Sequence, residues 1–141
     1  MKIRKHIWLA LFGSLALAGI AMLFVDTIPP RSMTHTSMHM CKRRVLRYAH
    51  KHGKLPSALG DTDVIEGFHE SLKDGWGVEL EYSADANDVV IFRSLGKDRN
   101  PGGVGDSVDM TGVFSARRLD GSWSDETVEW KQDPYEQFRN R

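Results

Sequence analysis

Residues 38–56, MHMCKRRVLRYAHKHGKLP, carry the pattern that decides the fold of this chain. Apolar residues recur there at intervals of three and four, the spacing that places side chains on one face of an α-helix: Met38, Cys41, Val45, Tyr48 and Ala49. Gly53 follows at the position where a left-handed residue commonly ends a helix. The sequence therefore predicts an amphipathic helix that begins at Ser32 or Thr34 and ends near His52.

Beyond this helix the hydrophobic period changes to two, which is the period of a half-buried β-strand. Residues 78–83 alternate in this way, the apolar run 89–92 follows, and Asn87-Asp88 between them is a turn pair, so we expect a β-hairpin. Two shorter strands are predicted on either side of the Asp120-Gly121 turn: 113–114 and 128–130. One long helix packed on a small antiparallel sheet is an α+β fold.

The N-terminal 25 residues predict a membrane anchor. Residues 7–25 contain no charged side chain, and a helix of that length spans about 28 Å, close to the hydrocarbon thickness of a bilayer. A cleaved signal peptide is the alternative, but this apolar run is longer than a signal core needs. Lys2, Arg4 and Lys5 precede the run. The positive-inside rule therefore predicts a single-pass inner (cytoplasmic) membrane protein with a cytoplasmic N-terminus and a periplasmic C-terminal domain.

Equal numbers of basic and acidic residues, nineteen of each, conceal an uneven distribution of charge. Residues 26–60 have a net charge of +6, whereas residues 61–141 have a net charge of −9. The zero total argues against a nucleic-acid-binding protein. The basic stretch predicts either a solvated helix face or an internal partner for the acidic C-terminal part.

Residues 98–109, DRNPGGVGDSVD, supply three carboxylates and one side-chain amide in a glycine-rich loop. Oxygen ligands in a flexible loop suit calcium, which accepts six to eight oxygen atoms, and suit zinc or copper poorly. The EF-hand template fails, because Asp109 stands where it requires Glu and a strand precedes the loop. Two interpretations remain: a calcium loop of another kind, or an acidic surface turn.

A series of motif residues surrounds this loop in a fixed order: Asp74, Trp76, Gly77, Tyr82, Ser94, Gly96, Asp98, Gly102, Gly103, Gly105 and Asp109. The order resembles the C-terminal region of the major pseudopilins, the protein G subunits of type II secretion systems. That family has D-P-W-G, a Tyr, S-x-G-x-D, G-G-x-G and D-I in this sequence. The resemblance covers about residues 38–110.

The resemblance implies a pilin-like fold, in which one long helix has a membrane part and a soluble part. It also implies a calcium ion in the loop after the second strand, bound by the carboxylates of Asp98 and of Asp106 or Asp109 and by the Leu95 carbonyl. The implied function is a membrane-anchored structural or assembly subunit of a type II secretion or related pilus-type apparatus. Its partners would be other pseudopilins or membrane proteins of the secretion apparatus.

The chain also departs from the family pattern. No acidic residue precedes Asp26, whereas the family has a Glu near the start of its mature helix. Pro29-Pro30 interrupts a helix that is continuous in the family, Gly75 replaces a Pro, and the chain continues well beyond Met110. These departures keep an alternative open: a stand-alone, membrane-tethered, calcium-binding interaction module outside any filament.

Two other functional classes rank lower. Ser, His and Asp occur in no nucleophile-elbow or zinc-helix motif, so neither an enzyme nor a small-molecule substrate is expected. Six soft metal ligands lie close together and raise the possibility of copper or zinc handling: Met33, His35, Met38, His39, Met40 and Cys41. Because Met38 and Cys41 belong to the apolar stripe of the helix, core packing is the favoured interpretation.

These predictions divide the chain into four parts. A cytoplasmic tip and transmembrane anchor occupies residues 1–25, and a juxtamembrane linker occupies residues 26–37. A pseudopilin-like domain follows at residues 38–130, and a polar tail at residues 131–141.

Overall fold

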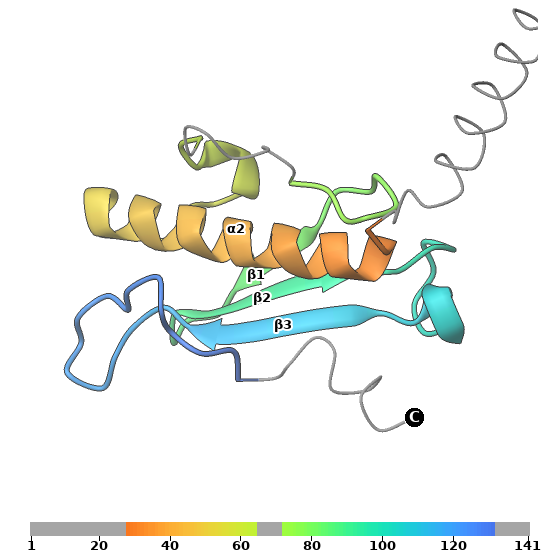
Figure 1. Cartoon of the computed structure of the whole chain (residues 1–141). Helices are drawn as coiled ribbons and strands as arrows, with labels where there is room; N and C mark the ends of the chain where they lie inside the picture. The colour runs from red at the N-terminus through yellow and green to blue at the C-terminus, as the bar shows by residue number, and fades with distance from the viewer. Residues whose placement is uncertain (1–27, 65–71, 132–141) are drawn as a thin grey trace, which may run out of the picture.

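The computed structural model describes residues 28–64 and 72–131, which form an α+β unit of one helix packed on a three-stranded antiparallel sheet (Figure 1). This confirms the predicted α+β class. The predicted anchor at residues 7–25 and nearly all of the predicted polar tail lie outside the described residues. Within the described residues, no helix has both the length and the apolar character needed to cross a membrane.

Helix α2, Pro30–His52, starts earlier than either predicted cap. Pro29 is its N-cap residue, and its side chain accepts no hydrogen bond from the first turn. Pro30 occupies the first helical position, where the missing N–H costs nothing. The helix therefore takes up much of the stretch 26–37 that was predicted as a linker. It ends as predicted, because Gly53 has φ 69° and its N–H donates to the Ala49 carbonyl at 2.8 Å.

The three strands are β1 (Glu81–Ala84), β2 (Val89–Ser94) and β3 (Met110–Ser115), in the order β1-β2-β3. The predicted hairpin is confirmed by the antiparallel pairing of β1 and β2. Its first strand begins later than expected, since residues 78–80 contribute only an isolated bridge between Lys73 and Glu79. Strand β3 pairs with β2 along its whole length and extends beyond the predicted residues 113–114.

The strand predicted at residues 128–130 is wrong, because this segment has no regular structure. The side chains of Val128 and Trp130 are both partly buried against the core cluster. Trp130 makes edge-to-face contacts with Phe92 and Phe114. The predicted turn at Asp120-Gly121 is confirmed: it lies between Arg117 and Trp123, which form an isolated antiparallel bridge.

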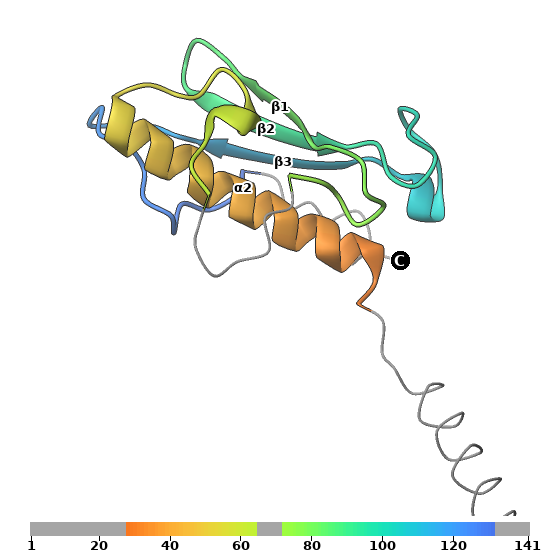
Figure 2. The same ribbon diagram turned by 90° about the horizontal axis from the view of Figure 1, so that it is seen from above.

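The core lies between α2 and one face of the sheet, which the helix crosses obliquely (Figure 2). Four residues of the predicted apolar stripe of α2 are fully buried there: Met38, Cys41, Val45 and Ala49. Leu46 is fully buried as well. Tyr48 is only partly buried and stacks on His52. The sheet contributes the alternate residues of its two longer strands: Val90, Phe92, Met110 and Phe114.

Residues 116–131 return along the basic side of α2. Glu126 accepts hydrogen bonds from Nε of Arg43 at 2.6 Å and from Nε of Arg47 at 2.5 Å, and these bonds lower the pKa of its carboxyl group. The Lys42 ammonium donates to the Val128 carbonyl at 2.6 Å. Of the two interpretations of the basic stretch, the structure therefore supports the internal partner of the acidic C-terminal part.

Candidate functional site

The turn at residues 74–77 is organised by the carboxylate of Asp74, which is only 5% exposed. Its Oδ1 accepts hydrogen bonds from the backbone N–H groups of Trp76 and Val78, both at 2.9 Å. An Asp that bonds the backbone two residues ahead in this way fixes a tight turn. The first motif of the resemblance is therefore a self-capped turn, not a set of free reactive groups.

Ser94, the last residue of β2, connects this turn to the glycine-rich loop. Its hydroxyl donates to Oδ2 of Asp74 at 2.6 Å and accepts from the N–H of Gly96 at 3.2 Å. Sequence reasoning matched Ser94 to a family serine without giving it a role. The structure shows that the role is to join two motifs that lie twenty residues apart in the chain.

Helix α2 reaches the same turn through Thr34. The Thr34 hydroxyl donates to the Pro30 carbonyl and accepts from the Gly75 N–H, each at 2.9 Å. One polar network therefore links the start of α2, the turn at residues 74–77, the end of β2 and the start of the following loop. Sequence reasoning missed this role of Thr34, because its partner lies 41 residues away and no local pattern signals the contact.

Gly75 stands where the resembled family has a proline, and the structure explains the change. A Cβ atom at position 75 would lie 1.9 Å from the carbonyl oxygen of Pro30. A proline would also lack the N–H that bonds Thr34. Two departures from the family pattern, the prolines before α2 and the glycine in the turn, therefore compensate for each other.

The glycine-rich loop, residues 95–109, folds back on itself. The N–H of Lys97 donates to the Asp106 carbonyl at 2.9 Å. A Cβ atom at Gly96 would lie 2.8 Å from that same carbonyl oxygen, so only glycine allows the approach. All five motif glycines have positive φ, which explains why glycine recurs in the motif: Gly77, Gly96, Gly102, Gly103 and Gly105.

The predicted calcium ligands Leu95, Asp98, Asp106 and Asp109 all belong to this loop, but arginines contact two of the carboxylates. Oδ2 of Asp109 accepts from Nη2 of Arg93 at 2.6 Å, and its Oδ1 accepts from the Gly102 N–H at 3.1 Å. The hydrogen bond to Asp109 raises the pKa of the Arg93 guanidinium.

The other two carboxylates lie in different surroundings. Oδ1 of Asp106 is 3.3 Å from Nε of Arg31, a residue of the first turn of α2. Asp98 is exposed, and its Oδ1 accepts from the N–H of Asn100 at 3.1 Å.

These carboxylates suit calcium in kind but are not gathered around one point. Among residues 28–64 and 72–131, no group of three His, Cys, Asp or Glu side chains lies close enough together to hold a metal ion. A calcium ion bound by Asp109 would share this carboxylate with Arg93, and one bound by Asp106 would share that carboxylate with Arg31. Calcium therefore stays a prediction, and in the present arrangement arginine side chains supply the positive charge.

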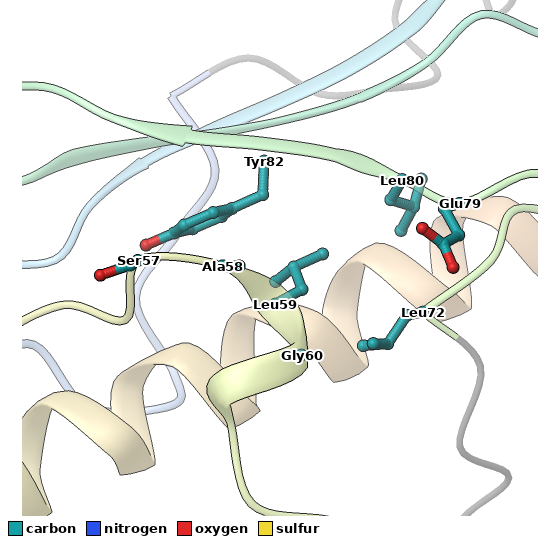
Figure 3. A pocket seen from close by; sticks show the side chains of 8 residues that line it. All are labelled: Ser57, Ala58, Leu59, Gly60, Leu72, Glu79, Leu80 and Tyr82. Atoms are coloured by element: carbon teal, nitrogen blue, oxygen red, sulfur yellow. The ribbon is translucent and has the colours of Figure 1, made fainter.

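Tyr82 and Trp76, the aromatic motif residues, support the sheet. The Tyr82 hydroxyl donates to the Pro56 carbonyl at 3.0 Å, and burial raises its pKa to about 12. The Tyr82 ring lies beside a cavity of about 290 Å³ (Figure 3). Trp76 packs, partly buried, against the core cluster. Small and apolar residues form most of the described cavity lining, and Glu79 is the one carboxylate among them.

The soft-ligand cluster is divided between different sides of α2. Met38 and Cys41 are fully buried, as the packing interpretation predicted, and burial raises the pKa of the Cys41 thiol to about 11. Nε2 of His35 and Nε2 of His39 lie 3.2 Å apart, and the Trp130 indole N–H donates to His39 at 3.2 Å. Met33 and Met40 instead line a groove of about 540 Å³ beside the turn at residues 74–77.

No known family model matches the chain, and neither a curated protein nor a solved structure was found to match it. The likeness to the major pseudopilins therefore depends on the ordered motif alone.

The contact between Gly75 and Pro30 predicts a large penalty for the smallest possible side chain. We expect Gly75→Ala to lower the free energy of unfolding by about 1–3 kcal/mol, the usual range for overpacking. Gly60→Ala is the matched control, because a Cβ atom at position 60 meets nothing within 4 Å and we expect a change within about 0.5 kcal/mol. Denaturant unfolding of the full chain in detergent, followed by circular dichroism, measures both. Equal stability of the two variants would contradict the close contact.

Proposed function

We propose that this protein is a membrane-anchored, pseudopilin-like structural or assembly subunit of a type II secretion or related pilus-type apparatus. The observation that carries the proposal is the 2.6 Å hydrogen bond between Ser94 and Asp74. It brings together two separate motifs of the resemblance, and both of its partners are motif residues. A chance likeness of sequence gives no reason for such a contact.

The architecture gives further support. Helix α2 spans 23 residues, begins shortly after the predicted anchor and packs along an antiparallel sheet. This is the arrangement that a pilin-like fold would have. Under this proposal the chain crosses the inner membrane once, its C-terminal domain is periplasmic, and its partners are other pseudopilins or secretion-apparatus membrane proteins.

A structural role also agrees with the chemistry of the motif residues. Asp74 and Ser94 are 5% and 2% exposed, and their oxygen atoms bond groups of the same chain. Arg43, Arg47 and Lys51 pair with acidic residues of the same domain instead of forming a surface for a nucleic acid. We therefore propose neither catalysis nor nucleic-acid binding.

The alternative function, a membrane-tethered calcium-binding module outside any filament, is favoured by one observation. Residues 116–131 have no counterpart in the family pattern, yet they cover the basic side of α2 and bury part of Trp130 against it. A side of α2 covered in this way is not available to a neighbouring subunit. The subunit role therefore predicts that a neighbouring pseudopilin contacts the remaining exposed residues of α2, whereas the stand-alone module predicts no such contact.

Site-specific crosslinking in cells separates the two functions. Thr36 is exposed on α2, so a photoreactive amino acid placed there should form adducts with proteins that carry a prepilin-type N-terminus, identified by mass spectrometry. The same group at Leu119, which is fully exposed in the turn after β3, is the control and should give no such adduct. Absence of pseudopilin adducts from position 36 would contradict the subunit role and favour the stand-alone module.

Calcium enters this proposal as an ion that stabilises the loop at residues 95–109, with Leu95, Asp98, Asp106 and Asp109 as its ligands. A ligand that binds only the folded state raises stability by mass action, by about 2.7 kcal/mol at a concentration of 100 Kd. We expect calcium to raise the melting temperature of the full chain in detergent by a few degrees relative to chelator.

Asp98→Ala should abolish this increase, whereas Asp120→Ala, which removes an exposed Asp from a different turn, should retain it. Identical melting curves with calcium and with chelator would show that the loop is closed by its arginine contacts without an ion. That result would remove calcium from the proposal and leave the crosslinking test unaffected.

A further inference from the structure

The end of the domain where α2 begins carries exposed apolar side chains on two separate segments. Ile28 and Met33 at the start of the helix are 67% and 46% exposed, and Val104 in the glycine-rich loop is 79% exposed. The contact between Arg31 and Asp106 ties the loop to the first turn of the helix, and both segments lie at the same end of the ribbon (Figures 1 and 2). These residues therefore form one surface, called here the loop end.

The length of chain between this surface and the predicted anchor is short. Ile28 follows Val25, the last residue of the apolar run, by three positions. An extended chain covers at most about 3.6 Å per residue, so Ile28 lies within about 11 Å of the end of the anchor. Because the headgroup layer of a bilayer is itself about 5–7 Å thick, Ile28 and the start of α2 lie beside the membrane surface if residues 7–25 span it.

The outward charge of the loop end is weakly basic, because Lys97 and Arg99 flank the exposed carboxylate of Asp98. Lys97 and Arg99 are exposed, and no ion pair or side-chain hydrogen bond engages either of them within the part of the chain that the structure describes. By contrast, the loop carboxylates Asp106 and Asp109 are in contact with arginines. Basic side chains near an anionic lipid surface contribute about 1 kcal/mol of attraction each.

An apolar groove lies at the same end. It has a volume of about 540 Å³ and runs between α2 and the turn at residues 74–77, with Ile28, Met33 and Met40 among its lining residues. Exposed apolar side chains flanked by basic ones are the composition of a surface that contacts the lipid interface.

We propose that the loop end is a docking surface for anionic phospholipid. Lys97 and Arg99 bind the lipid phosphates, and Val104 lies among the headgroups. The inference depends on the membrane anchor of the proposed function and adds a second contact with the bilayer. Docking at two points fixes the orientation of the domain on the membrane, which a short single-chain connection does not do.

A fluorophore attached at position 104 of the full chain tests this directly. Val104→Cys gives a selective labelling site, because Cys41 is fully buried and its thiol pKa is about 11. Leu119→Cys is the matched control: it is also an exposed apolar turn residue, but it follows β3 whereas the loop precedes that strand. The labelled chains are reconstituted in vesicles of phosphatidylcholine alone and of phosphatidylcholine with an equal part of phosphatidylglycerol.

We expect a quencher attached to the lipid headgroup to reduce fluorescence from position 104 at least twofold more than from position 119, and more strongly with phosphatidylglycerol. Lys97→Gln combined with Arg99→Asn should remove the effect of phosphatidylglycerol. Asn suits position 99, where φ is 61°, so the loop keeps its conformation and an unchanged melting temperature verifies this.

Other outcomes would overturn the inference. Equal quenching at positions 104 and 119, or quenching at position 104 that is the same in both kinds of vesicle, would contradict an anionic lipid surface while leaving the anchor intact. A chain that does not float with the vesicles would instead contradict the membrane anchor, and with it the proposed function.

Discussion

The buried carboxylate of Asp74 is the group on which the rest of this structure depends. A charge removed from water must be compensated by hydrogen-bond donors, or it destabilises the fold by several kcal/mol. Here three donors meet it: the backbone N–H groups of Trp76 and Val78, and the hydroxyl of Ser94. Because the donors come from a turn and from the end of a strand, satisfying one carboxylate fixes the relative position of both.

The same requirement extends to α2 and to the glycine-rich loop. Gly75 can approach the start of the helix only because it lacks a side chain, and its N–H then satisfies Thr34. On the far side, Ser94 also holds the N–H of Gly96, where the loop begins. Two of the loop carboxylates, Asp106 and Asp109, contact arginines of α2 and β2, so this end of the domain is a charged surface.

Local patterns in the sequence predicted the elements better than their contacts. The period of the apolar residues and Gly53 gave the helix and its end, but the start was missed because prolines are tolerated in a first turn. Alternation predicted the hairpin, whereas the short strand predicted at 128–130 is wrong, since Trp130 packs against the core from an irregular segment. A short apolar run alone does not distinguish a strand from an irregular segment that packs against the core.

In the candidate site too, the sequence identified residues but not their long-range contacts. The order of the motif identified Asp74 and Ser94, and the positive φ of the glycines agrees with their recurrence. The contacts of the site with α2 were not predictable, because Thr34 and Gly75 lie 41 residues apart and Arg31 and Asp106 lie 75 residues apart. Contacts at such separations follow from the packing of α2 on the sheet, and no spacing along the chain encodes them.

A double-mutant cycle between Asp74→Ala and Ser94→Ala tests the central claim most directly. Residues that share a buried hydrogen bond show coupling energies of about 0.5–3 kcal/mol. Because Ser94→Ala removes a donor that the Asp74 carboxylate needs, the account predicts that the double variant is less destabilised than the sum of the two single variants by an amount in that range. Additive effects on the free energy of unfolding would contradict it.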